Sequence, residues 1–217
     1  MLLFSANAGG IQNIWLWLKA IDQWLFIYIN TIWTNKFFDS IIPIWRESYT
    51  WIPLYLFLLL FVVINFGWKA FPWICLFIIT VSLCDQVSST FVKNWIARPR
   101  PCSDPFFSQY VRLLLSRCPS SGSFTSSHAV NHFGMTVFIV LTFKPFIGKW
   151  KYVAYLWAAS IAYGQVYMGV HYPFDVVGGA VLGSLLGWFA ASFYNRHFAL
   201  ATAADGESLR PKMTVDG

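Results

Sequence analysis

Charged residues are scarce in this sequence. They make up 11% of its 217 residues, whereas about a quarter of a typical soluble domain is charged. Acidic residues are the rarer kind, with 9 Asp and Glu against 15 Lys and Arg. Hydrophobic residues account for 57% of the chain and aromatic residues for 20%, and the mean hydropathy is +0.55. This composition excludes an ordinary soluble domain and predicts an all-α integral membrane protein.

Cysteine is also scarce, and its spacing excludes the common metal sites. The four cysteines form neither a Cys-x-x-Cys pair nor a Cys/His ligand pattern. Cys75 and Cys84 lie inside an apolar run, where cysteine packs as a small hydrophobic residue. Cys102 and Cys118 flank a polar loop, and the sequence leaves open whether they are bonded. A disulfide between them would place that loop in an oxidising compartment, outside the cytoplasm.

The excess of basic residues gives a formal charge of +6. These residues lie between apolar segments and do not form a soluble basic face, which argues against nucleic acid as a partner and for anionic membrane lipids. The turns on one side of the expected bundle carry Lys69, Lys144, Lys149, Lys151 and Arg196. The positive-inside tendency identifies that side as cytoplasmic. The long loop 93–127 then lies outside, and its own basic residues oppose the rule, which suggests that they have a function.

Five apolar segments are predicted to cross the membrane as helices. They cover residues 51–66, 71–92, 129–143, 150–168 and 174–194. The segment 11–33 is apolar and aromatic but carries Lys19, Asp22 and Gln23. We therefore expect it to form a helix at the membrane interface, with a further transmembrane helix as the alternative. A short helix and a turn are expected over 34–49.

The expected organisation has three parts. Residues 1–48 form an N-terminal interfacial helix region, 49–195 form a transmembrane catalytic domain with about five or six transmembrane helices, and 196–217 form a polar, disordered tail. The sequence places three polar clusters on the outer side of this bundle, and together they indicate chemistry at one site.

The first cluster combines Lys93 and Arg100 at the exit of the second span. The prolines between and after them favour an irregular return over a continuing helix. Arginine offers a planar fork and lysine a compact charge, a suitable pair for the oxygens of a phosphate. The alternative is that both residues only anchor the chain at the lipid interface.

The second cluster is Ser126-Ser127-His128 at the start of the third span. Hydroxyl residues before a helix commonly cap it, but a helix start also offers free N–H groups to an anion. The third cluster joins His171 to Asp175 at the start of the last span. There the carboxylate can hold one ring nitrogen and leave the other as a nucleophile; the alternative is an N-terminal helix Asp that only neighbours a histidine.

In this order, Lys93…Arg100-Pro101, Ser126-Ser127-His128 and His171…Asp175 resemble the three-part motif of the type 2 phosphatidic acid phosphatase superfamily. The resemblance covers about residues 20–195. Two positions depart from the usual pattern. Thr125-Ser126-Ser127-His128 stands for the usual Pro-Ser-Gly-His, and Gly164-Gln165 stands for the usual Ser-Arg, whose arginine binds the phosphate. Among the residues that could replace that arginine are Arg98, Arg112 and Arg117.

The resemblance implies a membrane lipid phosphatase that needs no metal or other cofactor. His171 is the expected nucleophile, which forms a phosphohistidine, Asp175 orients it, and His128 is the acid and base. The expected substrate-binding residues are Lys93, Arg100, Ser126, Ser127 and Gln165. The expected substrate is a lipid phosphate or diphosphate at the outer face of a bacterial inner membrane. Undecaprenyl diphosphate is slightly favoured, and phosphatidylglycerol phosphate and lipid A phosphate are alternatives.

Two other functions remain open on the sequence. Because Gln165 carries no charge, the chain could bind or translocate phosphorylated lipids without hydrolysing them. The same residues could also pass the phosphoryl group to an acceptor other than water.

Overall fold

The computed structural model describes residues 10–198, and the regular elements of that range are helical. The longer helices are α1 (Gly10–Ile27), α2 (Lys36–Trp45), α3 (Ile52–Phe66), α4 (Ala70–Gln86), α6 (Ser127–Thr142), α8 (Trp150–Tyr167) and α9 (Pro173–His197). The π-helical turns Tyr28–Ile32 and Val87–Val92 extend α1 and α4, and the short helices are α5 (Lys93–Ile96) and α7 (Lys144–Ile147). Brief 3-10 turns cover Ser48–Trp51, Gly67–Lys69, Pro101–Ser103 and Ser108–Tyr110.

Each of the five predicted spans coincides with a helix, from α3 to α9. The helix expected over 11–33 is present as α1 and its π-helical extension, and the short helix expected over 34–49 is present as α2. Whether α1 lies at the interface stays a prediction. Most of the predicted tail, residues 199–217, lies outside the described residues, as do residues 1–9.

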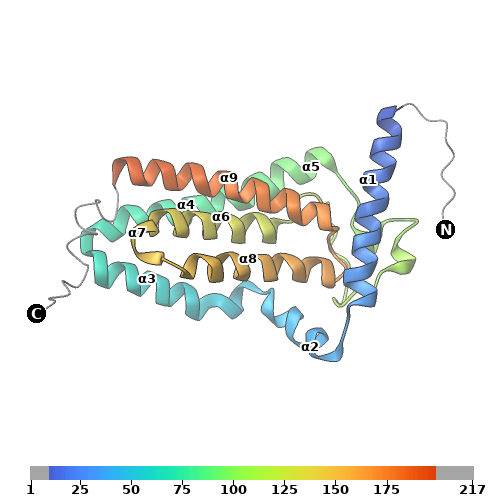
Figure 1. Ribbon diagram of the computed structural model, residues 1–217, viewed down its shortest axis with the longest axis horizontal. Coiled ribbons are helices and arrows are strands. Elements are labelled where there is room, and N and C mark those ends of the chain that lie inside the picture. Colours follow the sequence, from blue (N-terminus) through green and yellow to red (C-terminus); the bar gives the residue numbers. More distant parts are fainter. Residues whose placement is uncertain (1–9, 199–217) are drawn as a thin grey trace, which may run out of the picture.

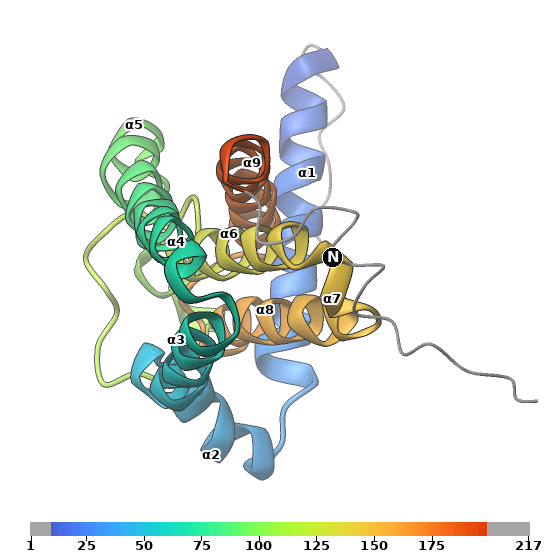
Figure 2. The same cartoon turned by 90° about the vertical axis from the view of Figure 1, so that its left-hand side faces the viewer.

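The helices α3, α4, α6, α8 and α9 lie side by side and form the bundle, while α1 stands across one end of it (Figure 1). The view along the bundle shows α6 and α8 flanked by α3, α4 and α9 (Figure 2). The helical stretches Ser48–Ser103 and Pro173–His197 are long and apolar enough to cross a membrane. In the first of these, only 6% of the most apolar window is buried inside the protein, as expected for apolar side chains that face lipid.

Glycines bring α6 and α9 into close contact. Gly179, Gly183 and Gly187 follow one another at four-residue spacing on the buried face of α9. A Cβ atom at Gly183 would meet the Val130 carbonyl oxygen of α6, and one at Gly187 would meet the carbonyl oxygen of Gly134. Small residues at this spacing let two membrane helices approach backbone to backbone. The first turns of both helices are therefore held together at one end of the bundle.

The N-terminal segment is attached to the same end of the bundle by a buried amide. Asn30 is fully buried, and its Nδ2 donates to the carbonyl oxygens of Arg112 and Tyr167, each at 2.8 Å. Its Oδ1 accepts the N–H of Arg112, also at 2.8 Å. Every polar group of this side chain is thus paired with backbone far away in sequence. The turn after α1 is fixed against the long loop and the end of α8.

The basic turns and the polar clusters lie at opposite ends of the bundle. The α3–α4 turn, α7 and the end of α9, which carry the lysines and Arg196, lie on the left in Figure 1. The loop after α5, the start of α6 and the α8–α9 turn lie on the right. The sequence-based assignment of these charges to two sides of the bundle agrees with this arrangement.

The glycine contact predicts a strong effect of one added carbon. Gly183→Ala should destabilise the protein by more than the 1–3 kcal/mol typical of core overpacking, because the new Cβ meets backbone, which cannot rotate away. Val181→Ile adds one carbon to the exposed face of the same helix and should leave the midpoint of thermal unfolding in detergent within about a degree. Equal midpoints for the two variants would contradict the close contact.

Candidate active site

Three segments far apart in the sequence meet at one end of the bundle. They are the loop that follows α5, the first turn of α6, and the turn between α8 and α9 (Figure 1). Ala97 ends α5 in the left-handed conformation, at φ 47°, and Pro99 and Pro101 follow. The chain therefore turns back from the helix here, as the prolines predicted, and carries Arg98 and Arg100 toward the other two segments.

Lys93 reaches the start of α6 from the end of the α4–α5 run. Its side chain is buried, and Nζ donates to Ser127 Oγ at 2.7 Å. Ser88 Oγ, on the π-helical turn before Lys93, donates to the same oxygen at 2.7 Å. The lysine charge is thereby held beside the first turn of α6. In that turn the N–H groups of Ser127 and His128 have no acceptor within the helix.

Ser126 is the N-cap of α6 and links it to α9. Its Oγ accepts the N–H of Ala129 at 3.5 Å, so this side chain has the capping role that was the alternative at the sequence level. Its own N–H donates to the carbonyl oxygen of Asp175 at 3.1 Å. The capping residue thus ties the serine cluster to the His171–Asp175 turn.

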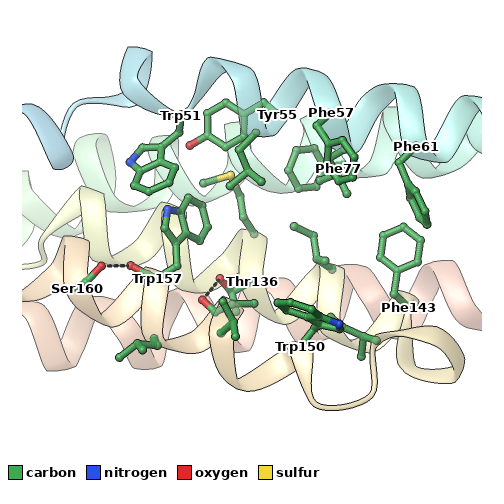
Figure 3. Close-up of a pocket in the computed structure, with 18 of the residues that line it drawn as sticks. Trp51, Tyr55, Phe57, Phe61, Phe77, Thr136, Phe143, Trp150, Trp157 and Ser160 are labelled. Atoms are coloured by element: carbon green, nitrogen blue, oxygen red, sulfur yellow. Dashed lines mark hydrogen bonds between the residues drawn. The ribbon is translucent and has the colours of Figure 1, made fainter.

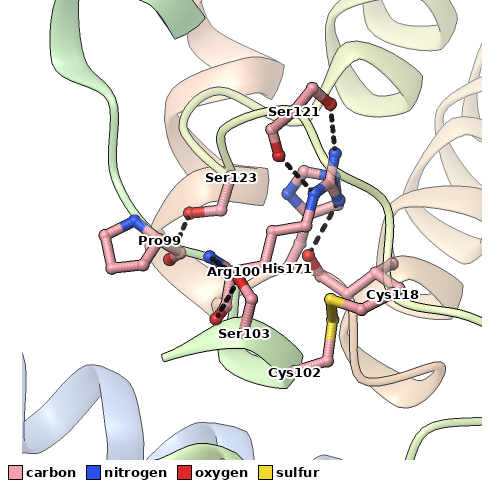
Figure 4. Close-up of a disulfide and its surroundings, with 9 residues drawn as sticks. Pro99, Arg100, Cys102, Ser103, Cys118, Ser121, Ser123 and His171 are labelled. Atoms are coloured by element: carbon pink, nitrogen blue, oxygen red, sulfur yellow. Dashed lines mark hydrogen bonds between the residues drawn. A yellow bond between two sulfur atoms is a disulfide. The ribbon is translucent and has the colours of Figure 1, made fainter. Parts of the chain in front are cut away.

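Arg100 faces His171 directly. Its Nη1 lies 3.1 Å from His171 Nε2, and the same nitrogen donates to the Val170 carbonyl oxygen at 3.0 Å. Ser121 fixes the other side of the guanidinium, because its carbonyl oxygen and its Oγ accept from Nε and Nη2 at 2.7 and 3.0 Å (Figure 4). A guanidinium can only donate, so Nε2 of His171 is an acceptor and its lone pair points toward the cationic group.

His171 is therefore in the form that a nucleophile requires. With Nε2 unprotonated, the ring proton lies on Nδ1, which is 3.7 Å from Asp175 Oδ2. Burial, reinforced by the Arg100 charge and partly offset by Asp175, lowers the pKa of His171 to about 4. At neutral pH the ring is uncharged and its Nε2 lone pair is available.

Asp175 is held in place by a buried ion triad. Arg98 lies between two carboxylates, with Nη1 2.6 Å from Asp175 Oδ1 and Nη2 2.6 Å from Asp22 Oδ2. The other oxygens of the two carboxylates accept backbone N–H groups of Tyr172 and Phe174, both at 2.8 Å. Both carboxylates are saturated with donors, and Asp175 has little freedom to turn away from His171.

His128, the predicted acid and base, projects from the first turn of α6. Its Nε2 lies 3.3 Å from Nη2 of Arg46, the residue that ends α2. Lys93 lies on the same side of this turn, because its Nζ donates to Ser127, the residue before His128. His132, one turn further along, stacks parallel to it with ring centroids 6.4 Å apart.

Gln165 supports the site through its backbone. Its carbonyl oxygen accepts the N–H groups of Val170 and His171 at 3.2 and 3.3 Å. Its fully buried side chain donates back to the Ile161 carbonyl oxygen at 3.4 Å, and its Oε1 has no hydrogen-bond partner. The side chain is thus engaged within its own helix in this structure.

The polar loop is closed by a disulfide. Cys102 and Cys118 are bonded, which decides the question that the sequence left open. The bond lies beside the Arg100–Ser121 contact, and Cys102 and Cys118 are each within three residues of one of those partners (Figure 4). It therefore anchors both strands of the loop that hold the Arg100 guanidinium against His171.

The structure brings together all the residues that the sequence predicted for the site, with the Gln165 side chain turned aside. Sequence reasoning missed three of their neighbours: Asp22, Ser121 and the position of Arg46. It named Arg98 and Arg112 among the possible replacements for an arginine at 165, but Arg98 pairs with the two carboxylates and Arg112 pairs with Asp39 at 2.7 Å. The only sequence signal for a role of Asp22 was its position as an acidic residue in a largely apolar helix, α1.

Comparisons with known proteins agree with this geometry. The family model of the PAP2 superfamily matches residues 70–199. A lipid A 4'-phosphatase of Bacteroides thetaiotaomicron is 31% identical over 175 residues, which cover 79% of this chain and 76% of the relative. A lipid A 4'-phosphatase of Porphyromonas gingivalis is 25% identical, and the match covers 82% and 75% of the two chains.

The fold also matches a solved structure. The crystal structure of a transmembrane PAP2-type phosphatidylglycerolphosphate phosphatase from Bacillus subtilis superposes with a TM-score of 0.61. The match covers 83% of this chain and 87% of the other, at 24% identity. At this identity the likeness bears on the fold alone.

The disulfide predicts a measurable loss of stability on its removal. Cys102→Ser/Cys118→Ser should lower the free energy of unfolding by about 3 kcal/mol, because a closed loop of this length restricts the unfolded chain by roughly that amount. The double variant should show the same midpoint with and without a reducing agent, and Cys75→Ser, at an unbonded cysteine, is the control that should respond to reduction as wild type does. The wild-type midpoint should fall on reduction, and an unchanged wild-type midpoint would contradict a stabilising bond.

The ion triad predicts that an isosteric change at Asp22 of α1 lowers the stability of the protein. Asp22→Asn should destabilise the protein by about 3 kcal/mol, because it leaves part of the Arg98 charge buried without a partner. Asp39→Asn breaks the more exposed pair with Arg112, whose side chains are 34% and 28% exposed, and it should cost about 1 kcal/mol or less. Thermal unfolding of both variants in the same detergent tests this order; the reverse order would contradict it.

Proposed function

This chain belongs to the PAP2 superfamily and is a membrane lipid phosphatase, and we propose that its substrate is the 4'-phosphate monoester of lipid A. Two relatives that match most of the chain carry the name lipid A 4'-phosphatase. This proposal replaces the slight preference for undecaprenyl diphosphate that the sequence alone gave. The observation that carries the catalytic part is the alignment of Arg100, the His171 ring and Asp175.

An apolar groove offers a place for the substrate's acyl chains. It has a volume of about 1120 Å³ and lies between α3 on one side and α6 and α8 on the other (Figure 3). Trp51, Tyr55 and Trp157 lie at one end of it, and Phe61, Phe143 and Trp150 lie toward the other. Apolar surface of this kind binds hydrocarbon chains without desolvating polar groups.

The groove continues toward the catalytic histidine. A second cavity of about 540 Å³ shares Tyr55, Phe77 and Met135 with the groove and is also lined by Ser127 and His128. A lipid whose chains lie in the groove can therefore present its phosphate near His128. The proximity of an apolar groove to a polar site supports a lipid substrate over a water-soluble phosphate.

The proposed reaction has two steps. In the first, Nε2 of His171 attacks the phosphorus atom, the bond from phosphorus to the lipid oxygen breaks, and that oxygen takes a proton from His128. Asp175 stabilises the positive charge that develops on the His171 ring. In the second, His128 takes a proton from water, the water oxygen attacks phosphorus, the P–N bond breaks, and inorganic phosphate leaves.

The phosphoryl oxygens need donors that are in place before the reaction. Arg100 already points at the nucleophilic nitrogen, and Lys93 lies beside the free N–H groups of Ser127 and His128 at the start of α6. Donors preorganised in this way stabilise the charge of the transition state. We assign these groups to binding, with Ser126 capping the helix and Gln165 positioning the backbone of His171.

We place the site on the outer side of a bacterial inner membrane. The disulfide near Arg100 requires an oxidising compartment, and the basic turns at the opposite end favour the cytoplasmic side. These two arguments are independent and agree. The division into an N-terminal interfacial region and a transmembrane catalytic domain is part of the same proposal.

The nucleophile assignment predicts a covalent phosphoenzyme. Incubation of the purified protein with a phosphorus-32-labelled lipid phosphate, followed by a rapid quench in alkali, should trap an acid-labile label on His171. His171→Gln should abolish the label and lower phosphate release by about 10⁴-fold or more. His197→Gln, at an exposed histidine at the far end of α9, should behave as wild type. Label retained in His171→Gln would contradict the assignment.

The substrate assignment is tested with a panel in mixed micelles. It comprises lipid A with a phosphate at the 4' position only, lipid A with a phosphate at the 1 position only, phosphatidylglycerol phosphate and undecaprenyl diphosphate. We expect the highest kcat/KM with the first. A higher value for any other lipid overturns the assignment, and phosphate binding without release from any lipid would favour the binding or translocating function.

A further inference from the structure

Arg46 contacts the site from a part of the chain that the family model does not match. It ends α2, ahead of the matched residues 70–199. Its side chain is 11% exposed, and its Nη2 lies 3.3 Å from Nε2 of His128. The guanidinium can only donate, so Nε2 of His128 accepts from it and the His128 ring is neutral in this state. Arg100 donates to Nε2 of His171 in the same way.

Most of the Arg46 guanidinium remains free to bind an anion. Its Nε and Nη1 are buried and have no hydrogen-bond partner. Glu47, the neighbouring acid, lies 3.6 Å from Nε, beyond good hydrogen-bond distance. A buried donor without an acceptor costs free energy, and the planar fork of arginine fits two oxygens of a phosphate. The Arg46 guanidinium therefore has the geometry of a phosphate-binding group, and a bound phosphate would accept hydrogen bonds from its unpaired Nε and Nη1 groups.

The charge of Arg46 also acts on the cluster that we assign to phosphate binding. Arg46 lines a polar cavity together with Ser121, the residue that holds the Arg100 guanidinium, and its charge acts on the pKa of Arg100 and of His128. Like charges brought together in a buried site repel, and an anion between them removes that repulsion. A dianionic phosphoryl group near both histidines meets this requirement.

No other arginine of the described residues offers the same combination. Arg98 is bound by two carboxylates, and Arg112 is bound by Asp39 and by Asn30. Arg117 is exposed. Position 165, where the motif pattern has a cation, holds an uncharged side chain that donates to its own helix.

We propose that Arg46 binds the transferring phosphoryl group together with Arg100, and that it supplies the charge which Gln165 lacks. This assignment rests on the proposed phosphatase site. When substrate enters, the free N–H groups of Arg46 donate to phosphoryl oxygens, and Nη2 leaves His128. Nε2 of His128 is then free to take up a proton from solvent water, and this is the proton that the leaving lipid oxygen receives. A residue of the N-terminal segment is thus part of the binding site.

The test separates anion binding from turnover. We compare wild type, Arg46→Gln, Arg46→Lys and the control Arg117→Gln. Arg117 is exposed, and it lines the same polar cavity of about 620 Å³ as Arg46 does. The first readout is the dissociation constant of orthovanadate, which resembles the pentacoordinate transition state, from its effect on thermal unfolding. The second is kcat/KM for the lipid phosphate that wild type hydrolyses best.

Arg46→Gln should weaken vanadate binding at least tenfold and lower kcat/KM by about 10²–10³-fold, the usual effect of losing one preorganised donor. Arg46→Lys should lie between this variant and wild type, because it keeps the charge and loses the fork. Arg117→Gln should stay within twofold of wild type. Vanadate binding by Arg46→Gln that equals wild type overturns the proposal, whatever the turnover.

A measurement on the unmodified chain covers the case in which the Arg46 variants do not fold. Phenylglyoxal modifies accessible arginines, and mass spectrometry locates the products. Vanadate should slow modification at Arg46 and leave the rate at Arg117 unchanged; equal rates at Arg46 with and without vanadate overturn the proposal. If wild type binds vanadate through Arg46 but releases no phosphate from any lipid, the proposed function fails and the assignment of Arg46 as an anion ligand stands.

Discussion

The ion triad of Asp22, Arg98 and Asp175 is the interaction on which the rest of the site depends. A buried carboxylate is costly unless its oxygens are paired, and here every oxygen of both carboxylates has a donor within 2.8 Å. Arg98 also lies 4.2 Å above the Tyr172 ring. The triad therefore joins α1, the loop after α5 and the first turn of α9, and it holds Asp175 facing the ring of His171.

Helix packing supplies the second constraint, because the serine cluster of α6 meets the His171–Asp175 turn only if α6 and α9 begin close together. Contacts at Gly183 and Gly187 set the separation of these helices along their length. The hydrogen bond from Ser126 to the Asp175 carbonyl oxygen then fixes their first turns relative to each other. Membrane helices gain little from burying apolar surface against one another, so close backbone approach and a few polar contacts determine the geometry of the site.

The sequence predicted the features that depend on local pattern. Apolar runs gave the five helices from α3 to α9, and the motif residues Lys93, His128 and His171 meet at one end of the bundle. The sequence did not predict that Asp22, Arg46 and Ser121 belong to the site, because each acts through a contact between residues far apart in the chain. Arg46 and His128, for example, are 82 positions apart. No periodicity or spacing encodes such a pair. The departure at Gln165 indicated that a charge was missing, and the fold places the Arg46 guanidinium beside His128 of the same site.

The balance of charge at the site explains why the substrate has to be a strong anion. Arg98 is compensated by its two carboxylates, whereas Arg100 and Arg46 donate to neutral imidazoles and Lys93 donates to a hydroxyl group. Within the described residues, Lys93 and Arg100 thus have no carboxylate in an ion pair, and Arg46 has only Glu47 at 3.6 Å, in a setting where water screens these charges weakly. A phosphomonoester dianion compensates most of this charge, and so does the phosphate product. Tight binding of the product follows from the same electrostatics. In the proposed cycle, the two imidazoles that contact Arg46 and Arg100 in this structure are the competing acceptors that allow its release.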